Sequence, residues 1–260
     1  MSKALFVYTT TTLCVAGLGL ACSAQSSIQP SSAVISETGS QVTGHLVVPV
    51  AKPDSPAKHL VKLPPAVIWL TPISSVTAAD KIADLPNPPQ TFTLLQKDKM
   101  FTPHLLVVPV GSSVAFPNAD PFFHNVFSLF DGKRFDLGLY EAGSTRTVVF
   151  GREGVSYIFC NIHSEMSAVV VSLSTPFYSI ADQRGGFHLK NVPEGEYELH
   201  VWIEGQRQTS LDRPLRKVHI PANSIDLGQV DGATTLDNAK HSPHLNKFGR
   251  PYEPDPNPIY

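Results

Sequence analysis

The chain has 260 residues, of which 42% are hydrophobic and 16% charged, and its formal net charge is -2. That apolar content is enough for one large hydrophobic core or two small ones. The small net charge excludes the basic surface field on which binding to nucleic acid or anionic lipid depends. Pro is abundant, with 23 residues, and few segments have a helical pattern, which favours a β protein with many turns.

The N-terminus has the features of a secretory signal peptide. Lys3 precedes an apolar, uncharged stretch (ALFVYTTTTLCVAGLGLA), and small residues follow it. Cleavage after Ala21 or Ala24 predicts a periplasmic or otherwise exported protein whose mature chain has no transmembrane segment. In one alternative Cys22 is a lipid-modified first residue, although Gly19 stands where lipoprotein signals usually have Leu. In a second alternative the apolar stretch is a membrane-spanning helix. Its threonines and the small-residue cleavage site that follows argue against that alternative.

Export would leave a single cysteine in the mature domain. Cys14 lies within the predicted signal peptide, Cys22 at its end, and Cys160 far downstream. Exported proteins usually pair their cysteines. The leftover Cys160 therefore indicates an intermolecular disulfide, or a reactive or metal-ligating thiol.

Residues 25–90 begin with a polar linker over 25–40. VTGHLVVPV alternates and is β-branched, so it predicts a strand, and the prolines of AKPDSPAKHLVKLPP predict a loop. AVIWL predicts a short apolar strand. VTAADKIADL predicts a short helix that ends at PNPP.

Short strands become regular from residue 91. The runs TFTLLQK, HLLVVPV, SSVAFPN, HNVFSLF, RTVVFG, VSYIFC and AVVVSL are rich in Val, Phe and Ile and are bounded by turn residues. Seven such runs predict an antiparallel β-sandwich. FYSIADQ, GGFHLKNV, GEYELHVWIEG and RKVHIP predict a smaller β domain behind it. The polar, Pro-rich tail from residue 231 is expected on the surface or disordered.

The segment YIFCNIHSEMSAVVV places three candidate ligands in one tight turn between two strands. Cys160, His163 and Met166 are spaced by three and three, so a single loop can aim all of them at one point. A thiolate, an imidazole and a thioether suit copper. Zinc gains nothing from the methionine, and calcium and magnesium prefer oxygen ligands.

A second imidazole from a distant strand would complete a plane of two histidines and one cysteine, with Met as a weak axial ligand. His124, at the start of the run HNVFSLF, is a candidate, but spacing alone leaves the other histidines open. A lone His or Met is more often a packing residue. A catalytic alternative makes Cys160 a nucleophile with His163 as its base, but no third group to orient the base is evident. The chain is therefore not expected to be an enzyme.

CNIHSEM, followed by a β-branched strand, resembles the ligand loop of cupredoxins, the blue copper proteins, with a length closest to that of amicyanin. GSSVAFPNADPFFHNVFSLF resembles their upstream ligand segment. The resemblance implies an all-β fold with a cupredoxin-type Greek-key β-sandwich and one type 1 copper ion. The implied ligands are His124, Cys160, His163 and Met166. Asn125, expected to tie the two ligand segments together by hydrogen bonds, and Asn161 are the implied outer residues of the site.

ADQRGGFHLKNVPEGEYELHVW resembles the latter half of a carboxypeptidase-regulatory-like (transthyretin-like) β-sandwich module. VTGHLVV and AVIWL would suit the first two strands of that module, which leads to the hypothesis that the copper domain is inserted into it. The predicted organisation is a signal peptide (1–24), a linker (25–40), an N-terminal β segment that would suit the second module (41–65), a copper domain (66–173), a carboxypeptidase-regulatory-like module (174–230) and a tail (231–260).

The expected function is that of a periplasmic one-electron carrier whose redox partner docks near His163. The alternative is a copper-binding module for storage, delivery or sensing without redox turnover.

Overall fold

Strands make up the regular secondary structure of the chain wherever the computed structural model describes it, at residues 39–48, 62–73, 88–129, 132–206, 211, 214–232 and 245–252. No helix occurs in these ranges, and so none that is long and apolar enough to cross a membrane. The predicted all-β class is confirmed. The predicted signal peptide and the predicted helix at VTAADKIADL lie outside the described residues.

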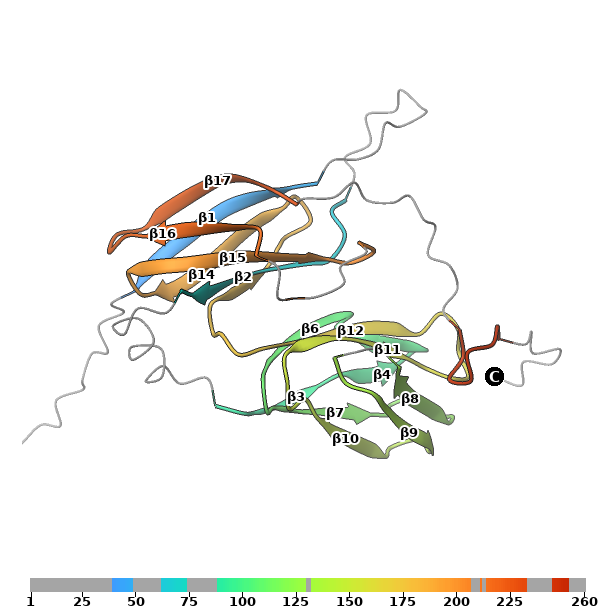
Figure 1. Cartoon of the computed structure of the whole chain (residues 1–260). Helices are drawn as coiled ribbons and strands as arrows, with labels where there is room; N and C mark the ends of the chain where they lie inside the picture. The colour runs from blue at the N-terminus through green and yellow to red at the C-terminus, as the bar shows by residue number, and fades with distance from the viewer. Residues whose placement is uncertain are drawn as a thin grey trace, which may run out of the picture. The chain divides into compact units, whose positions relative to one another are not determined.

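The strands from residue 91 to residue 173 form a first β-sandwich, called sandwich I below (Figure 1). They are β3 (Thr91–Thr93), β4 (Leu95–Lys97), β5 (Met100–Thr102), β6 (Leu105–Pro109), β7 (Ser113–Pro117), β8 (His124–Ser128), β9 (Phe135–Tyr140), β10 (Thr145–Val149), β11 (Gly154–Phe159) and β12 (Ser167–Leu173). One sheet has the order β6-β12-β11-β8-β9, the other has the order β10-β7-β3, and β4 and β5 form a hairpin.

The two sheets of sandwich I share one hydrophobic core. Val114 and Phe116 enter it from β7, Val126 from β8, Ile158 from β11 and Val170 from β12, and all five are fully buried. Along β7 buried and half-buried residues alternate, as expected for a strand with one face on the core. This core forms the base on which the ends of β8 and β11 are held.

The remaining strands form sandwich II, which contains both ends of the described strand sequence. They are β1 (Ser40–Val47), β2 (Ala66–Pro72), β13 (Tyr178–Ile180), β14 (Gly186–Val192), β15 (Gly195–Ile203), β16 (Arg216–Ile220) and β17 (Ile225–Asp231). Their sheets have the orders β14-β1-β17 and β13-β2-β15-β16. Val42, Leu46, Ile68, Leu199 and Val218 are among the buried residues of their common core.

The pairing of β2 differs from the predicted boundary at residue 66, where the copper domain was expected to begin. β2 pairs with β13 and β15, for example Ile68 with Ser179 and with Val201, and so belongs to sandwich II. β1 pairs antiparallel with β14 and parallel with β17. The chain therefore leaves sandwich II after β2, completes sandwich I, and returns at β13, which is the connectivity that the insertion hypothesis requires.

A third cluster of buried residues joins strands of both sandwiches. Val67, Trp69 and Trp202 contribute from β2 and β15, and side chains of β6 and β12, including Val107 and Val169, complete it. β2 is thus buried on both faces, which explains its uninterrupted apolar run AVIWL.

Three strands were not predicted from the sequence: β5, β9 and β17. β9 and β17 are half exposed, and each contains a glycine with positive φ, Gly138 at 68° and Gly228 at 62°. Their weak alternation and their glycines are typical of turns rather than strands. Within the predicted tail, residues 245–252 are exposed or half-buried and contact sandwich I, as described below.

Candidate metal centre

Three of the four predicted ligand side chains converge at one end of sandwich I. His124 is the first residue of β8, Cys160 directly follows β11, and His163 lies in the turn before β12. Sγ of Cys160 is 3.7 Å from Nδ1 of His124 and 3.7 Å from Nδ1 of His163. All three ligand atoms lie within 4.8 Å of one another.

The sheet register explains this convergence. β11 pairs with β8 through Phe159 and Phe127, so the residue that follows Phe159 emerges beside β8. His124 and Cys160 are fully buried, whereas His163 is half-buried. Two ligands thus belong to the core, and the third lies at the surface of the sandwich.

These separations fit a shared metal ion. An ion bonded to a thiolate sulfur at about 2.3 Å and to an imidazole nitrogen at about 2.0 Å, with about 120° between the bonds, holds the two atoms about 3.7 Å apart. Both sulfur–nitrogen distances match that value. The donors are a soft thiolate and two imidazoles, which are ligands of copper and zinc.

The turn from Cys160 to Met166 is closed by its own backbone. The N–H of Cys160 donates to the carbonyl of Met166 at 3.3 Å, and the N–H of Met166 donates to the carbonyl of His163 at 3.1 Å. Met166 is fully buried in the same core cluster as Cys160. Cys160 is a free cysteine.

Phe122 shapes the site. Its ring centroid is 5.3 Å from that of His124 and 5.5 Å from that of His163. The two imidazoles are themselves 4.9 Å apart in an edge-on arrangement. Phe123 is 56% exposed and points away from the core.

Asp120 is a contact of the site that sequence reasoning missed. Its Oδ2 lies 2.7 Å from Nε2 of His124, and the carboxylate is buried. Burial alone would raise the pKa of Asp120, but the hydrogen bonds from His124 and from the N–H groups of Lys99 and Asp98 outweigh burial and lower that pKa below its usual value. An ionised carboxylate can only accept, so Nε2 carries the hydrogen and Nδ1 keeps the lone pair that a metal needs.

His163 is held as a neutral imidazole. Burial lowers the pKa of His163 to about 4, and the electrostatic effects of His124 and Lys99 act in the same direction, although Asp120 acts in the opposite direction. A neutral imidazole is the form that binds metal.

Asn125 and Asn161, the two predicted outer residues, are connected through the C-terminal segment. Nδ2 of Asn125 donates to Asp136 at 2.7 Å, a bond between β8 and β9 rather than the direct bond between the two ligand segments that was expected. Asp136 pairs with Nζ of Lys247 at 2.8 Å, and the backbone N–H of Lys247 donates to Oδ1 of Asn161 at 2.9 Å. The two ligand segments are thus linked indirectly.

A second bond from the C-terminal segment reaches a ligand residue itself. The hydroxyl of Tyr252 donates to the backbone carbonyl of Cys160 at 2.6 Å, and burial raises the pKa of Tyr252 above its usual value. Residues 245–252 therefore form a strap across the ligand loop (red in Figure 1). Nothing in the polar, Pro-rich sequence of the tail signals this contact.

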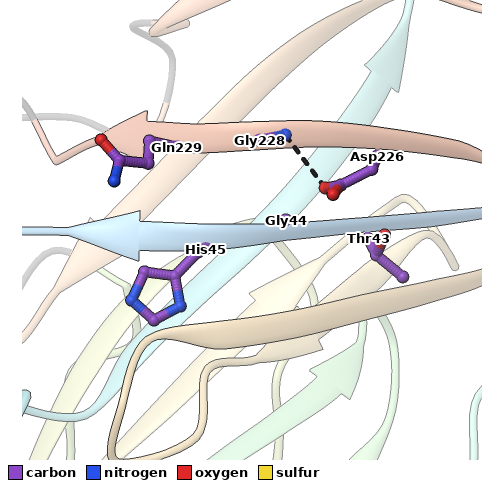
Figure 2. Close-up of a pocket in the computed structure, with 6 residues that line it drawn as sticks. All are labelled: Thr43, Gly44, His45, Asp226, Gly228 and Gln229. Atoms are coloured by element: carbon purple, nitrogen blue, oxygen red, sulfur yellow. Dashed lines mark hydrogen bonds between the residues drawn. The ribbon is translucent and has the colours of Figure 1, made fainter.

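A surface pocket also lies between β1 and β17 of sandwich II (Figure 2). It is lined by Thr43, Gly44, His45, Asp226, Gly228 and Gln229. The N–H of Gly228 donates to Asp226 across its rim at 3.0 Å. None of these residues belongs to an element that carries a candidate ligand.

No family profile and no curated protein matches the chain. Solved structures resemble part of it. A purple cupredoxin from Nitrosopumilus maritimus has 24% identity and a TM-score of 0.29, covering 32% of this chain and 99% of that one. Amicyanin from Paracoccus versutus has 19% identity and a TM-score of 0.30, covering 35% and 88%. The copper-containing nitrite reductase NirK from Thermus scotoductus has 20% identity and a TM-score of 0.31, covering 40% of this chain and 28% of that one.

Proposed function

We propose that this protein binds one copper ion through His124, Cys160 and His163, with Met166 as a weak fourth ligand. The observation that supports the proposal is the convergence of one thiol and two imidazoles, from separate segments, at the spacing of a shared metal ion. The buried methionine at the end of the same loop favours copper over zinc, because a thioether is a ligand for soft metals.

In this proposal the ion is a type 1 copper and the protein is a one-electron carrier of the cupredoxin kind. Copper would supply a one-electron redox couple. The chain holds the ligands in place before the metal binds, by the β8–β11 register, by the closed turn from Cys160 to Met166, and by the strap. A fixed ligand set that serves both oxidation states needs little reorganisation, which favours fast electron exchange.

Electrons would enter and leave at the half-buried edge of His163. Ile162 is 41% exposed beside it in the ligand loop, and it offers an apolar contact for a redox partner protein. We place the protein in the periplasm or elsewhere outside the cytoplasm, with Cys22 as an alternative site of a lipid anchor. Sandwich II is, on this view, a structural module of the carboxypeptidase-regulatory-like type.

A catalytic role for Cys160 is disfavoured by its surroundings. The residue is fully buried, and its Sγ faces two imidazoles rather than a cleft. A cysteine nucleophile needs access to substrate.

The test is the absorption spectrum and the redox behaviour of the purified protein after Cu(II) loading. We expect an intense thiolate-to-copper charge-transfer band, one copper per chain, and reversible reduction. Cys160→Ser should abolish the band, whereas His188→Gln, which changes a histidine outside the site, should keep it. A protein that takes up no copper would overturn the proposal. Copper transfer to an apo-acceptor without reversible reduction would replace electron carriage with copper delivery.

A further inference from the structure

We propose that Asp120 is a positioning residue of the metal centre, whose buried carboxylate orients His124 and supplies a negative charge that favours Cu(II) over Cu(I). This inference rests on the proposed function, because it assigns Asp120 a role toward the copper ion. It adds to the ligand set a residue that determines the reduction potential of the site.

The hydrogen bond between Asp120 and His124 fixes which imidazole nitrogen faces the metal. Asp120 is 4% exposed, His124 is fully buried, and their side chains meet at 2.7 Å. Such a carboxylate–histidine pair sets the ring orientation and makes the ligating nitrogen more basic. Because Nε2 is engaged, Nδ1 is directed at Sγ of Cys160.

The same carboxylate is itself held by the β4–β5 hairpin. The N–H of Asp98 donates to Oδ1 at 2.6 Å and that of Lys99 to Oδ2 at 3.0 Å. Asp98 and Lys99 are the two central residues of the turn and have φ angles of 55° and 56°, which non-glycine residues seldom adopt. The carboxylate of Asp120 thus accepts hydrogen bonds from both amides of this turn. The same two bonds hold the carboxylate against His124.

The charge of Asp120 is not neutralised by a basic side chain within the described part of the chain, where its ion-pair contact is with His124. Asp136, another carboxylate near the site, instead pairs with Lys247. Salt screens a buried charge much less than an exposed one. A negative charge beside a ligand therefore stabilises the more positive oxidation state and lowers the reduction potential.

The first measurement compares the reduction potential of the copper-loaded protein with those of three variants. Asp120→Asn removes the charge and retains an acceptor, and Asp120→Glu retains the charge. Glu165→Gln is the matched control, because it removes an exposed carboxylate from the ligand loop itself. We expect Asp120→Asn to lower the ratio of Cu(II) to Cu(I) affinity at least tenfold, which raises the potential by about 59 mV for a one-electron couple.

Glu165→Gln and Asp120→Glu should stay close to the unmodified protein. A shift in Asp120→Asn no larger than that of Glu165→Gln would overturn the proposal, because it would show that the buried position of the charge has no effect.

The second measurement needs neither a variant nor copper. Nitrogen-15 NMR of the copper-free protein reports the tautomer of His124, and we expect a hydrogen on Nε2 and none on Nδ1. The opposite tautomer would overturn the proposal even if Asp120→Asn fails to fold. If the protein does not take up copper, the proposed function fails by itself, while the tautomer still tests the hydrogen bond.

Discussion

At Cys160 the side chain and the main chain have separate partners. The thiol faces His124 and His163, the N–H bonds to the carbonyl of Met166, and the carbonyl accepts from Tyr252. The residue is therefore fixed at three points, and the direction of its sulfur does not depend on a metal being present.

Met166 offers a test of the fourth ligand at the scale of one residue. Met166→Leu conserves volume and should cost less than about 1.5 kcal/mol of stability. Because the thiolate and both imidazoles remain, we expect the charge-transfer band to persist while the reduction potential changes. Absorption spectroscopy and voltammetry of the copper-loaded protein check both outcomes.

Met100→Leu is the control, since Met100 is 57% exposed on β5. A potential that is the same in Met166→Leu, Met100→Leu and the unmodified protein would mean that Met166 only packs.

Among the elements, the strap of residues 245–252 is expected to stabilise the ligand loop. Tyr252→Phe removes the donor to the carbonyl of Cys160 and should cost about 1 kcal/mol. We expect faster hydrogen exchange of the backbone amides from Cys160 to Met166, measured by mass spectrometry or NMR.

Tyr197→Phe is the matched control, because Tyr197 also donates its hydroxyl to a carbonyl, that of Pro193 in sandwich II. It should leave exchange in the ligand loop unchanged. Equal effects of the two variants on the loop would contradict a local role for the strap.

The sequence predicted most strands of the fold and failed where the pattern is weak. β7, β11 and β12 are apolar and bounded by turn residues, so their alternation or β-branched runs are visible directly. β9 and β17 are half exposed and broken by glycine, and only pairing with neighbours makes them strands.

In the candidate site, too, the sequence reveals what is local and misses what depends on contacts between distant segments. The spacing of Cys160, His163 and Met166 is local, so one loop reveals it. The roles of Asp120 and Lys247 depend on contacts with other segments, the β4–β5 hairpin and the ligand loop, which only the folded chain brings together. Asp120 lies four residues before His124, but its acidic type and its Pro-containing turn suggested nothing more than a loop.

Across the whole molecule, His104 and Glu204 form an ion pair between the two sandwiches. Nε2 of His104 is 2.9 Å from Glu204, and Nδ1 is 3.1 Å from the carbonyl of Ser167. The hydrogen bond to Glu204 raises the pKa of His104, although burial opposes it. A raised pKa in the folded state means that the pair stabilises the fold fully below the unfolded-state pKa of about 6.5 and stops doing so as pH rises through the folded-state value.

His104→Gln should therefore destabilise the protein in mildly acidic solution. The loss of stability should become smaller as the pH rises into the alkaline range. Thermal unfolding across that range measures the difference. His219→Gln, which breaks the more exposed pair with Glu196 within sandwich II, is the control and should show a smaller effect. If the loss of thermal stability in His104→Gln instead grows with pH, the stabilising role of the protonated His104–Glu204 pair is contradicted.

The cluster shared by the sandwiches predicts that sandwich I is not soluble by itself. A fragment of residues 88–174 would expose an apolar face that includes Leu105, Val107 and Val169. Apolar patches of this kind promote association, so we expect oligomers in sedimentation velocity, relieved by the paired change Val107→Thr and Val169→Thr. A stable monomeric fragment without those changes would contradict this prediction.

The return of the chain to sandwich II has a consequence for how the protein is made. During synthesis β1 and β2 emerge first, but their partners β14, β15 and β17 emerge only after the whole of sandwich I. Sandwich I can complete its own pairings while the nascent chain is still growing, because its sheets pair only strands from residues 91 to 173. β2 must wait with open edges until about residue 203 has been added, and β1 until about residue 231, and this interval is when the new chain is most exposed to wrong partners.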